Sequence, residues 1–397
     1  MNKKLDELLK YSRKYVPFYS RIKGHESVHK AYEFMPVVSK EIMARKPETF
    51  ISTQYEARSL ENYLTSGSSG RPLTIYKSKR DVYKSSRQLW FWRKNEYGVS
   101  LHDKMCSLYI RSLARPLMPT TFVDGNILYL SAIKMDSNTI IEYLSAMKNF
   151  MPLWIYSNPS SLYLFVKYAL DAGCYTMPNI KYIELSGELL YDNYRECFSK
   201  FFSNAKIANL YGVREINAIA FELSCGHLHV LDDNFYLEHY GDNILVTGLN
   251  NYAMPFIKYI VEDNVKIEDS SCANGGQIIS ILNSRETDFV LLENSKLASP
   301  TLFHVWIEKI NTPLTKVIQY QVRQTDRNTL CFSIVLKRKT KENIILIKQE
   351  LVNLYVQSIF NNLNLDIEIV DVIHIDKLTG KYKYFYNDIV SIAVRKE

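Results

Sequence analysis

The first apolar residues of the chain recur at helical spacing. Leu5, Leu8 and Leu9 would share one face of a helix over residues 3–15, with charged residues between them. Pro17 follows this segment, and we expect the helix to end before it because proline lacks a backbone donor and clashes with the preceding turn. The pattern therefore predicts an opening helix with one buried stripe.

The segment from residue 60 to 97 combines strand and helix patterns. Residues 60–80 indicate a strand, a turn rich in serine and glycine, and a second strand, whereas residues 81–97 indicate a helix. Leu89 and the aromatic residues 90–92 lie within that helix. We expect these aromatic side chains to belong to the core rather than to a ligand platform.

Short apolar runs alternate with helical patterns between residues 105 and 190. The runs are at 105–110, 153–156 and 182–185, and the helical patterns are at 139–150 and 160–172. Such alternation favours a layered α/β body with much parallel sheet. The pattern then becomes strand-rich, with strands expected over 235–238, 244–247 and 256–261.

The composition changes again after residues 275–290. The remaining pattern predicts strands over 316–323 and 331–336, a helix over 341–359 and a strand over 366–372. A compact α+β domain accommodates these elements. We therefore expect a large α/β domain over residues 1–286 and a small α+β domain over residues 287–397.

The overall composition is that of a soluble globular protein. The 397 residues are 47% hydrophobic and 23% charged, and the formal net charge of +7 is spread along the chain rather than gathered in a basic arm. This distribution gives little support to nucleic-acid binding, although a mild attraction for polyanions such as ATP remains. We expect no nucleic-acid partner.

The cysteines and the apolar runs indicate the compartment. The six cysteines include no CxxC pair, and the chain begins with Met1-Asn2-Lys3-Lys4 and an amphipathic segment rather than with an apolar signal region. The chain has no run of about 18 uninterrupted apolar residues, which argues against a membrane span. We expect a cytoplasmic protein with no membrane partner.

The sharpest local motif is Thr65-Ser66-Gly67-Ser68-Ser69-Gly70-Arg71. Glycines let the backbone approach an anion closely, and consecutive N–H groups, the hydroxyls and the Arg71 guanidinium supply donors. A flexible surface linker is the alternative, but apolar-containing segments flank the motif closely, whereas linkers are longer and more polar. The spacing matches neither a Walker loop nor a GxGxxG motif. The motif therefore indicates a nucleotide site of another architecture.

Residues 65–77 resemble the phosphate loop of the adenylate-forming (ANL) superfamily, and further motifs follow in that superfamily's order. They are residues 5–19, Pro36-Val37-Val38-Ser39-Lys40, Ser186-Gly187-Glu188, Tyr211-Gly212-Val213-Arg214-Glu215, residues 247–259 and Gly380-Lys381-Tyr382. The ordered set is most similar to the branch of phenylacetate-CoA ligase and its capsule-biosynthesis-type relatives. The resemblance implies a large N-terminal adenylate-forming domain of layered sheets and helices and a small, mobile α+β C-terminal domain.

The resemblance assigns ATP- or AMP-binding roles to the matched positions. The loop residues Ser66, Gly67, Ser68, Ser69, Gly70 and Arg71 would bind phosphate. Gly187 and Glu188 would lie on a turn against the adenine ring, and Tyr211, next to Gly212, would offer its aromatic face to that ring. Asp263 would accept hydrogen bonds from the ribose hydroxyls, although Glu262 stands where the family has glycine.

Three further matched residues carry chemistry or motion. Glu215 resembles the carboxylate ligand of Mg²⁺, and its alternative is an ordinary surface carboxylate. Lys381, after a Thr-Gly turn, resembles the catalytic lysine of the small domain, whose ammonium would neutralise charge between the carboxylate and the α-phosphate. Arg285 resembles the hinge-region arginine, although Ser284 and the pair Thr287-Asp288 depart from the family's pattern.

Cysteine and histidine residues indicate a second site. In some members of the branch a structural zinc is held by a Cys and a His at the position of Cys225-Gly226-His227-Leu228-His229, and by a Cys-x-Cys pair further on. This chain keeps Cys225, His229 and Cys272 but has Asn274 at the last position. His227 is a candidate fourth ligand. A vestigial site without zinc is the alternative.

The resemblance implies ATP- and Mg²⁺-dependent activation of a carboxylic acid, with an aryl or arylacetic acid as the expected class. The acyl-adenylate would form with release of pyrophosphate, and the acyl group would pass to CoA. An amine, a carrier-protein thiol or a glycan group as acceptor stays open, as does a nucleotide-binding module without turnover. Partners would be the small-molecule acid, ATP, the acceptor and, in a homodimer, a second copy of the chain.

Overall fold

The computed structural model describes residues 3–22, 32–64, 73–109, 119–132, 137–177, 179–188, 190, 192–241, 243–263, 265–269, 272, 274–281, 289–292, 297–298, 300–312, 315, 317–373 and 384–389. The chain divides into two compact units. The first unit comprises Met1–Gly67, Arg71–Leu101 and Ala208–Asn283, and the second comprises Ser68–Gly70, His102–Ile207 and Ser284–Glu397. The boundary expected between residues 286 and 287 stays a prediction.

The first unit begins with short helices. Their bounds are α1 Lys3–Tyr15, α2 Pro17–Ser20, α4 Lys40–Arg45, and two 3₁₀ helices over Pro47–Phe50 and Ala57–Ser59. α1 buries Leu5, Leu8 and Leu9, which confirms the opening helix and its apolar stripe. Pro17 ends the pattern of α1 and starts α2, because the first turn of a helix accommodates proline.

The long helix α5 (Lys79–Tyr97) has well-defined ends. The Ser78 hydroxyl accepts a hydrogen bond from the Asp81 backbone N–H, and the Asp81 carboxylate accepts one from the Ser78 N–H, forming a capping box. Leu89 is buried, but the expected core position of the neighbouring aromatic residues is wrong for Phe91, which is 63% exposed. Residues two positions apart point to nearly opposite sides of a helix, so Phe91 faces away from the core that Leu89 enters.

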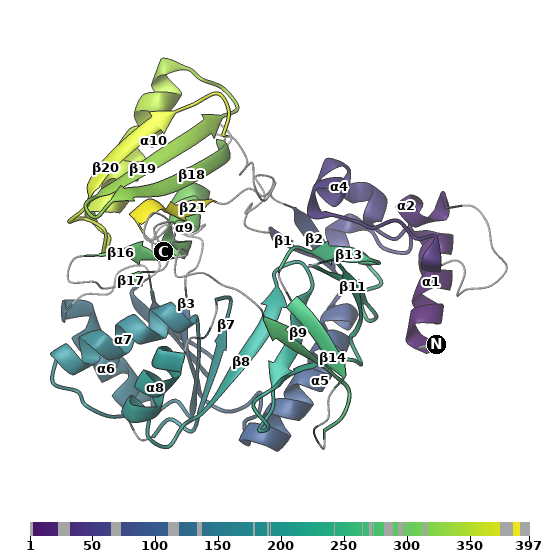
Figure 1. The fold of residues 1–397 in the computed structure, drawn as a ribbon, viewed down its shortest axis with the longest axis horizontal. Helices are drawn as coiled ribbons and strands as arrows, with labels where there is room; N and C mark the ends of the chain where they lie inside the picture. The colour runs from purple at the N-terminus through teal and green to yellow at the C-terminus, as the bar shows by residue number, and fades with distance from the viewer. Residues whose placement is uncertain are drawn as a thin grey trace. The chain divides into compact units, whose positions relative to one another are not determined.

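The strands of the first unit pair in antiparallel fashion (Figure 1). Their bounds are β1 Glu61–Leu64, β2 Thr74–Lys77, β8 Lys206–Val213, β9 Asn217–Glu222, β10 Leu228–Val230, β11 Phe235–Tyr240, β12 Asn243–Gly248, β13 Tyr259–Val261, β14 Val265–Asp269 and β15 Gln277–Ile281. β1 pairs with β2, β11-β12-β13 form a sheet, and five strands follow the order β8-β9-β10-β15-β14. The strands expected between 235 and 261 are confirmed, although the last begins at Tyr259.

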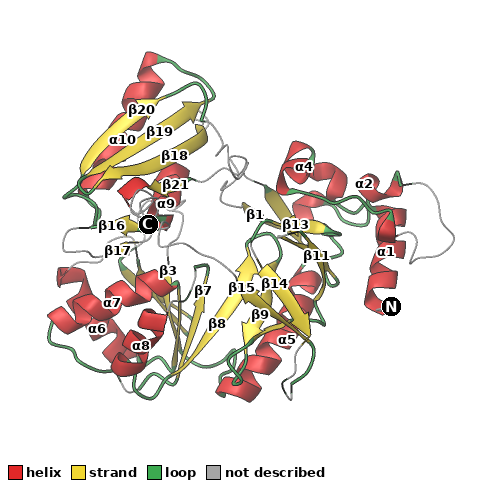
Figure 2. Ribbon diagram, viewed as in Figure 1, coloured by secondary structure: helices red, strands yellow, loops and turns green. Residues whose placement is uncertain are grey.

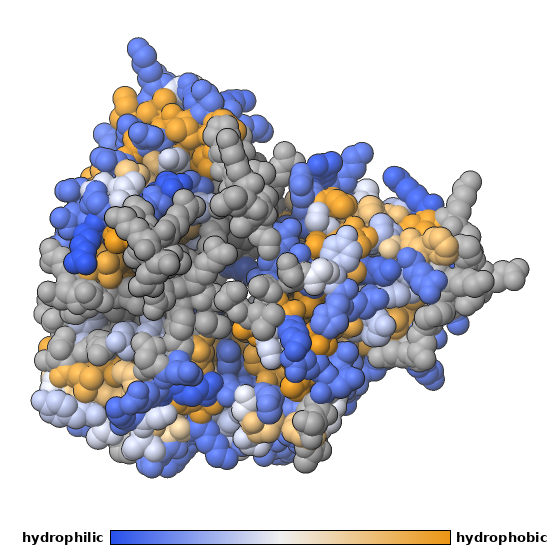
Figure 3. All heavy atoms as spheres, viewed as in Figure 1, coloured by the Kyte–Doolittle hydropathy of each residue, from blue (hydrophilic) through white to orange (hydrophobic). Residues whose placement is uncertain are grey.

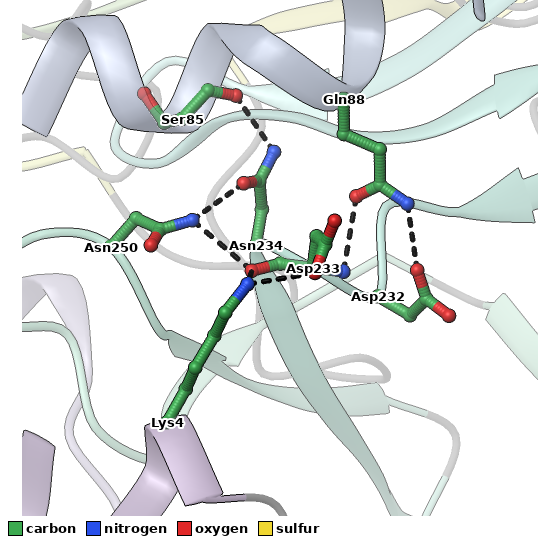
Figure 4. Close-up of polar contacts among 7 residues, drawn as sticks. All are labelled: Lys4, Ser85, Gln88, Asp232, Asp233, Asn234 and Asn250. Atoms are coloured by element: carbon green, nitrogen blue, oxygen red, sulfur yellow. Dashed lines mark hydrogen bonds and ion pairs between the residues drawn. The ribbon is translucent and has the colours of Figure 1, made fainter. Parts of the chain in front are cut away.

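A polar network joins α1, α5 and the turn before β11 (Figure 4). It comprises Lys4, Ser85, Gln88, Asp232, Asp233, Asn234 and Asn250. Asn234 is 2% exposed, and its side-chain amide donates to the Ser85 carbonyl at 2.7 Å and accepts from Asn250 at 2.7 Å. Buried amides need such partners, so this network fixes the turn that leads into β11.

The second unit contains the α/β body that the alternating pattern predicts. Its elements are β3 Met105–Tyr109, β4 Thr121–Asp124, β5 Ile127–Ser131, α6 Ser137–Phe150, β6 Trp154–Ser157, α7 Pro159–Asp171, β7 Tyr182–Ser186 and α8 Asp192–Phe201. The strands follow the order β7-β6-β3-β5-β4, and all pairs are parallel except β5 with β4. α7 packs against both α6 and α8 (Figure 1). The parallel sheet is therefore confirmed.

The C-terminal part of the second unit has α+β architecture (Figure 2). Its elements are β16 Val290–Leu291, β17 Leu297–Ala298, α9 Thr301–Ile310, β18 Val317–Asp326, β19 Thr329–Leu336, α10 Lys341–Val356, β20 Asn364–Ile369 and β21 Phe385–Asn387. A four-stranded sheet of order β20-β19-β18-β21 shares one apolar core with α9 and α10, centred on Trp306, Phe332 and Leu351. The predicted fold class, a large α/β domain with a smaller α+β domain, is confirmed.

The face of the molecule in Figure 3 carries both polar and apolar residues. Figure 3 shows hydrophilic residues over most of the described surface in view, with smaller apolar areas between them. Among the described residues, every helix is too short or too polar to cross a membrane.

Candidate functional site

Tyr211 and Asp263, two predicted nucleotide-binding residues, meet in the first unit. Tyr211 lies on β8 and is 8% exposed, and its hydroxyl donates to the Asp263 carboxylate at 2.8 Å. Burial raises the pKa of the Tyr211 phenol, and the negative charge of Asp263 raises it further. The phenol therefore stays protonated and orients an exposed carboxylate, which keeps acceptor capacity for other donors such as hydroxyls.

Gly212 closes the turn that carries Glu215. The pairing of β8 with β9 shifts register between Tyr211 and Gly212, and a Cβ at Gly212 would lie 2.3 Å from the backbone oxygen of Asn217. Asn217 itself has a left-handed backbone, with φ of 73°. The chain thus reverses tightly, and only a residue without a side chain fits at position 212.

Glu215 is buried within this turn, at 8% exposure. Its Oε1 lies 3.1 Å from the Nζ of Lys40, the first residue of α4. The alternative that Glu215 is a solvated surface carboxylate is therefore wrong, because the turn holds it against a lysine. A buried carboxylate of this kind suits Mg²⁺, which proteins bind through one or two carboxylates together with substrate phosphates.

Lys77, the last residue of the motif over 65–77, is a buried cation to which the sequence analysis assigned no role of its own. It is 6% exposed, and burial lowers the pKa of its ammonium to about 8, although the charges of Asp81 and Glu215 oppose that change. Ile75 and Lys77 both point inward from β2 because strand residues alternate. That alternation is the sequence signal that would have placed Lys77 inside.

A small cavity of about 20 Å³ lies beside Lys77. Its lining residues are Lys77, Asp81, Ser85, Ile216, Asn234, Phe235, Gly248, Asn250, Asn251 and Phe256. The Asp81 carboxylate accepts a hydrogen bond from the Ala253 N–H at 3.0 Å, which connects the start of α5 to the loop after β12. Asp81 therefore has a structural role at this cavity.

Gly187 and Glu188 lie in the second unit, directly after β7. Gly187 has φ of 88°, and a Cβ there would lie 2.6 Å from the Asn158 side-chain nitrogen. That nitrogen donates to the Ser186 carbonyl at 2.8 Å, and Glu188 is partly buried. The turn predicted after this strand is present, and it requires glycine at position 187.

The remaining predicted nucleotide-site residues lie outside the described residues. They are Ser66, Gly67, Ser68, Ser69, Gly70, Arg71, Arg285 and Lys381. The phosphate-loop motif connects β1 to β2, which pair from Glu61 with Lys77 to Leu64 with Thr74. The strand–turn–strand arrangement expected around the motif is thus confirmed for its two strands.

The three candidate zinc ligands come together in the first unit. The Sγ atoms of Cys225 and Cys272 lie 3.2 and 3.3 Å from His229 Nε2, and the three ligand atoms are within 4.8 Å of one another. His229 is buried on β10, where burial lowers its pKa, and its Nδ1 lies 3.2 Å from the Gly275 carbonyl.

This arrangement fits a zinc ion with three protein ligands. Tetrahedral zinc with ordinary bond lengths separates sulfur from nitrogen by about 3.6 Å, close to the distances here. A neutral His229 that donates from Nδ1 to Gly275 would leave Nε2 for the metal. His227 and Asn274 are both exposed, and neither belongs to this group of three among the described residues.

Comparison with known proteins rests on structure. No family model matches the sequence, and a search of curated proteins finds no match. The fold is similar to a crystal structure of 2-hydroxyisobutyryl-CoA ligase in complex with 2-HIB-AMP and CoA in the thioesterification state, with TM-score 0.61 and 12% identity over 99% of this chain and 91% of that chain.

The same ligase in the postadenylation state with R3-HIB-AMP gives TM-score 0.56 and 12% identity over 99% of this chain and 90% of that one. Its open conformation with 2-HIB-AMP and CoA gives TM-score 0.55 and 12% identity, covering 96% and 89%. The chain therefore has the fold of 2-hydroxyisobutyryl-CoA ligase over nearly its whole length.

Proposed function

We propose that this protein is an AMP-forming acid ligase of the adenylate-forming superfamily. It activates a carboxylic acid with ATP to an acyl-adenylate, releases pyrophosphate and transfers the acyl group to CoA. The likeness to a ligase solved with an acyl-adenylate and CoA supports this proposal over almost the entire chain. The ordered motifs, from the serine- and glycine-rich loop to Lys381, support it independently.

The arrangement of Tyr211, Asp263 and Glu215 in the first unit supports the proposal beyond the likeness of the fold. Tyr211 and Glu215 belong to one matched motif and Asp263 to a separate matched position, and all three lie in the first unit, on or after β8 and β13. The Tyr211 hydroxyl orients the Asp263 carboxylate, and a turn that requires Gly212 holds Glu215. This contact and this turn support our assignment of the three residues to one nucleotide site.

The proposed chemistry relies mainly on positioning and electrostatics. We assign Asp263 to the ribose hydroxyls, Tyr211 and Gly187 to the adenine, and residues 66–71 to the phosphate oxygens. Glu215 is the proposed ligand of Mg²⁺, which when bound would neutralise phosphate charge. Lys381 contributes positive charge where the acid's oxygen attacks the α-phosphate in line and pyrophosphate leaves.

The acid and the acceptor are finer proposals. The similarity to the phenylacetate-CoA ligase branch favours an aryl or arylacetic acid, and CoA as the acceptor. An amine, a carrier-protein thiol or a glycan group is the alternative acceptor. The proposed zinc site at Cys225, His229 and Cys272 would be structural, since it ties β10 to the segment before β15.

Pyrophosphate release tests the proposed function directly. The protein is incubated with ATP, Mg²⁺ and a panel of aryl, arylacetic, aliphatic and hydroxy acids, each with and without CoA. An acid-dependent release that CoA accelerates, with formation of a thioester detected by mass spectrometry, is the expected result. Release that CoA does not affect indicates another acceptor. Nucleotide binding without release for any acid contradicts an enzyme and supports a binding module.

A further inference from the structure

Lys40 and Glu215, which are far apart in the sequence, form an ion pair. The Nζ and Oε1 atoms are 3.1 Å apart, and the side chains are only 14% and 10% exposed. Exposed ion pairs contribute little, but a carboxylate in such a buried position needs a cation or hydrogen-bond donors as partners. Lys40 supplies that cation.

The backbone around Lys40 is anchored next to the proposed nucleotide site. The Val38 N–H donates to the Lys258 carbonyl at 2.9 Å, and the Ile260 N–H donates to the Val38 carbonyl at 2.9 Å, so residue 38 bridges to β13. Asp263 follows two residues after the end of the same strand. The position of Lys40 is therefore set by the strand that leads to the proposed ribose ligand.

Two lysines and two carboxylates interact around Glu215. The Lys40 ammonium pairs with Glu215, and the charges of Glu215 and Asp81 both act on Lys77. Asp81 is already engaged by the backbone N–H of Ala253. A dication that approaches Glu215 alone must therefore compete with the Lys40 ammonium, which repels it at short range.

We propose that Lys40 is a phosphate-binding residue whose ammonium pairs with Glu215 in the absence of nucleotide and turns to a phosphate oxygen when ATP binds, which leaves the Glu215 carboxylate to the Mg²⁺ that accompanies the nucleotide. This inference rests on the proposed function, since it assigns Glu215 to the metal. The ligand class is a nucleoside triphosphate together with its dication. When ATP and Mg²⁺ bind, Lys40 exchanges Glu215 for a phosphate oxygen, and Glu215 exchanges Lys40 for Mg²⁺. Both side chains therefore keep a partner of opposite charge.

The proposal makes metal and nucleotide binding respond differently to loss of Lys40. Removing the ammonium removes the competitor for Glu215, so Mg²⁺ alone should bind more tightly. The same change removes a phosphate contact, so ATP should bind more weakly when no metal is present. A purely structural ion pair would instead change stability and leave these two affinities unchanged.

Calorimetric titration of the full chain tests this exchange. Lys40→Met should weaken ATP binding without Mg²⁺ at least tenfold, and should strengthen binding of Mg²⁺ alone at least threefold. Lys46→Met, an exposed lysine just after α4, serves as the matched control and should change neither affinity. Lys40→Arg should restore most of the ATP affinity, because it keeps the positive charge.

A second variant guards against misfolding of Lys40→Met. In Lys40→Met/Glu215→Gln no unpaired buried charge remains, so the fold should be retained, and ATP binding without metal should still be weak. If wild type binds ATP and both Lys40→Met and the double variant bind it equally well, the inference is wrong while the proposed function stands. If wild type binds no nucleotide at all, the proposed function fails, and the role of Lys40 fails with it.

Discussion

The Tyr211 hydroxyl donates a hydrogen bond to the Asp263 carboxylate at 2.8 Å, which joins two residues 52 positions apart. Asp263→Ala should weaken binding of AMP and ATP roughly 10- to 100-fold, the range for loss of hydrogen bonds to a charged group. Tyr211→Phe should weaken nucleotide binding only several-fold. This variant loses the hydrogen bond that orients the Asp263 carboxylate but retains the aromatic ring. Calorimetry measures both affinities.

Tyr240→Phe is the control for this pair, since Tyr240 is a 47% exposed tyrosine of the same unit. Its nucleotide affinity should equal that of wild type. Full affinity in Asp263→Ala would show that Asp263 does not bind ribose.

Gly212→Ala should destabilise the first unit. A Cβ at this position would lie 2.3 Å from the Asn217 carbonyl oxygen and 2.9 Å from the Ala218 Cα, both of which are backbone atoms that cannot rotate away. We expect a loss of about 1–3 kcal/mol in the free energy of unfolding, the usual cost of overpacking, measured by urea denaturation. At Gly248 a Cβ has its nearest neighbour at 4.0 Å, so Gly248→Ala is the matched control. Equal stability of the two variants would contradict this account of the turn.

Lys77 should make stability depend on alkaline pH. Burial lowers its pKa to about 8, whereas an unfolded lysine has a pKa of about 10.4. Between these values the unfolded chain binds a proton that the folded chain has released, so the free energy of unfolding rises with pH. The rise from Lys77 should reach about 3 kcal/mol, at 1.36 kcal/mol per pKa unit.

Lys77→Met should lack this contribution. Urea denaturation at pH 7, 8, 9 and 10 should show that the free energy of unfolding of Lys77→Met exceeds that of wild type by the largest amount at pH 7. This difference in free energy should shrink as the pH rises. Lys79→Met replaces an exposed neighbour and should follow the wild-type curve. Parallel curves for wild type and Lys77→Met would mean that Lys77 has an ordinary pKa.

The sequence predicted the elements better than the contacts between them. The spacing of Leu5, Leu8 and Leu9 defines a helix face because helical periodicity is a local property. Phe91 shows the limit of predicting burial from such patterns, since an apolar side chain within a helix need not face the core. The Cys225, His229 and Cys272 group was found because a family motif already linked its members, and the structure brings all three together.

The pairing of Lys40 with Glu215 had no comparable signal. It depends on how residues 36–40 dock against β13, which is a tertiary contact that neither periodicity nor a short motif encodes. Lys77 ends the motif over residues 65–77, but the motif gave it no role of its own. Its place two residues after Ile75 in a strand is the signal that points it inward.

The protein as purified should contain about one zinc ion per chain. Cys272→Ser should lower both the zinc content, measured by elemental analysis, and the melting temperature, because metal binding to a structural site contributes to folding. Cys331→Ser is the control, as Cys331 lies in the C-terminal α+β part and its thiol contacts Asp366. Zinc-free wild-type protein of unchanged melting temperature after chelation would favour the vestigial alternative.

Lys381→Ala separates an enzyme from a binding module. A lysine that acts on charge developing in the transition state contributes little to ground-state ATP binding, so calorimetry should give nearly unchanged ATP affinity. Adenylate formation, measured as pyrophosphate release with a working acid, should fall at least about a hundredfold, the scale for loss of one preorganised charge donor. Attack of the acceptor on preformed acyl-adenylate should fall far less, because the resemblance to the superfamily implies that the small domain turns this lysine out of the site before that step. Lys383→Ala, two residues away, should preserve both half-reactions. Equal loss in both half-reactions for Lys381→Ala would point to misfolding, and an unchanged first half-reaction would make Lys381 a surface residue and remove it from the proposed mechanism.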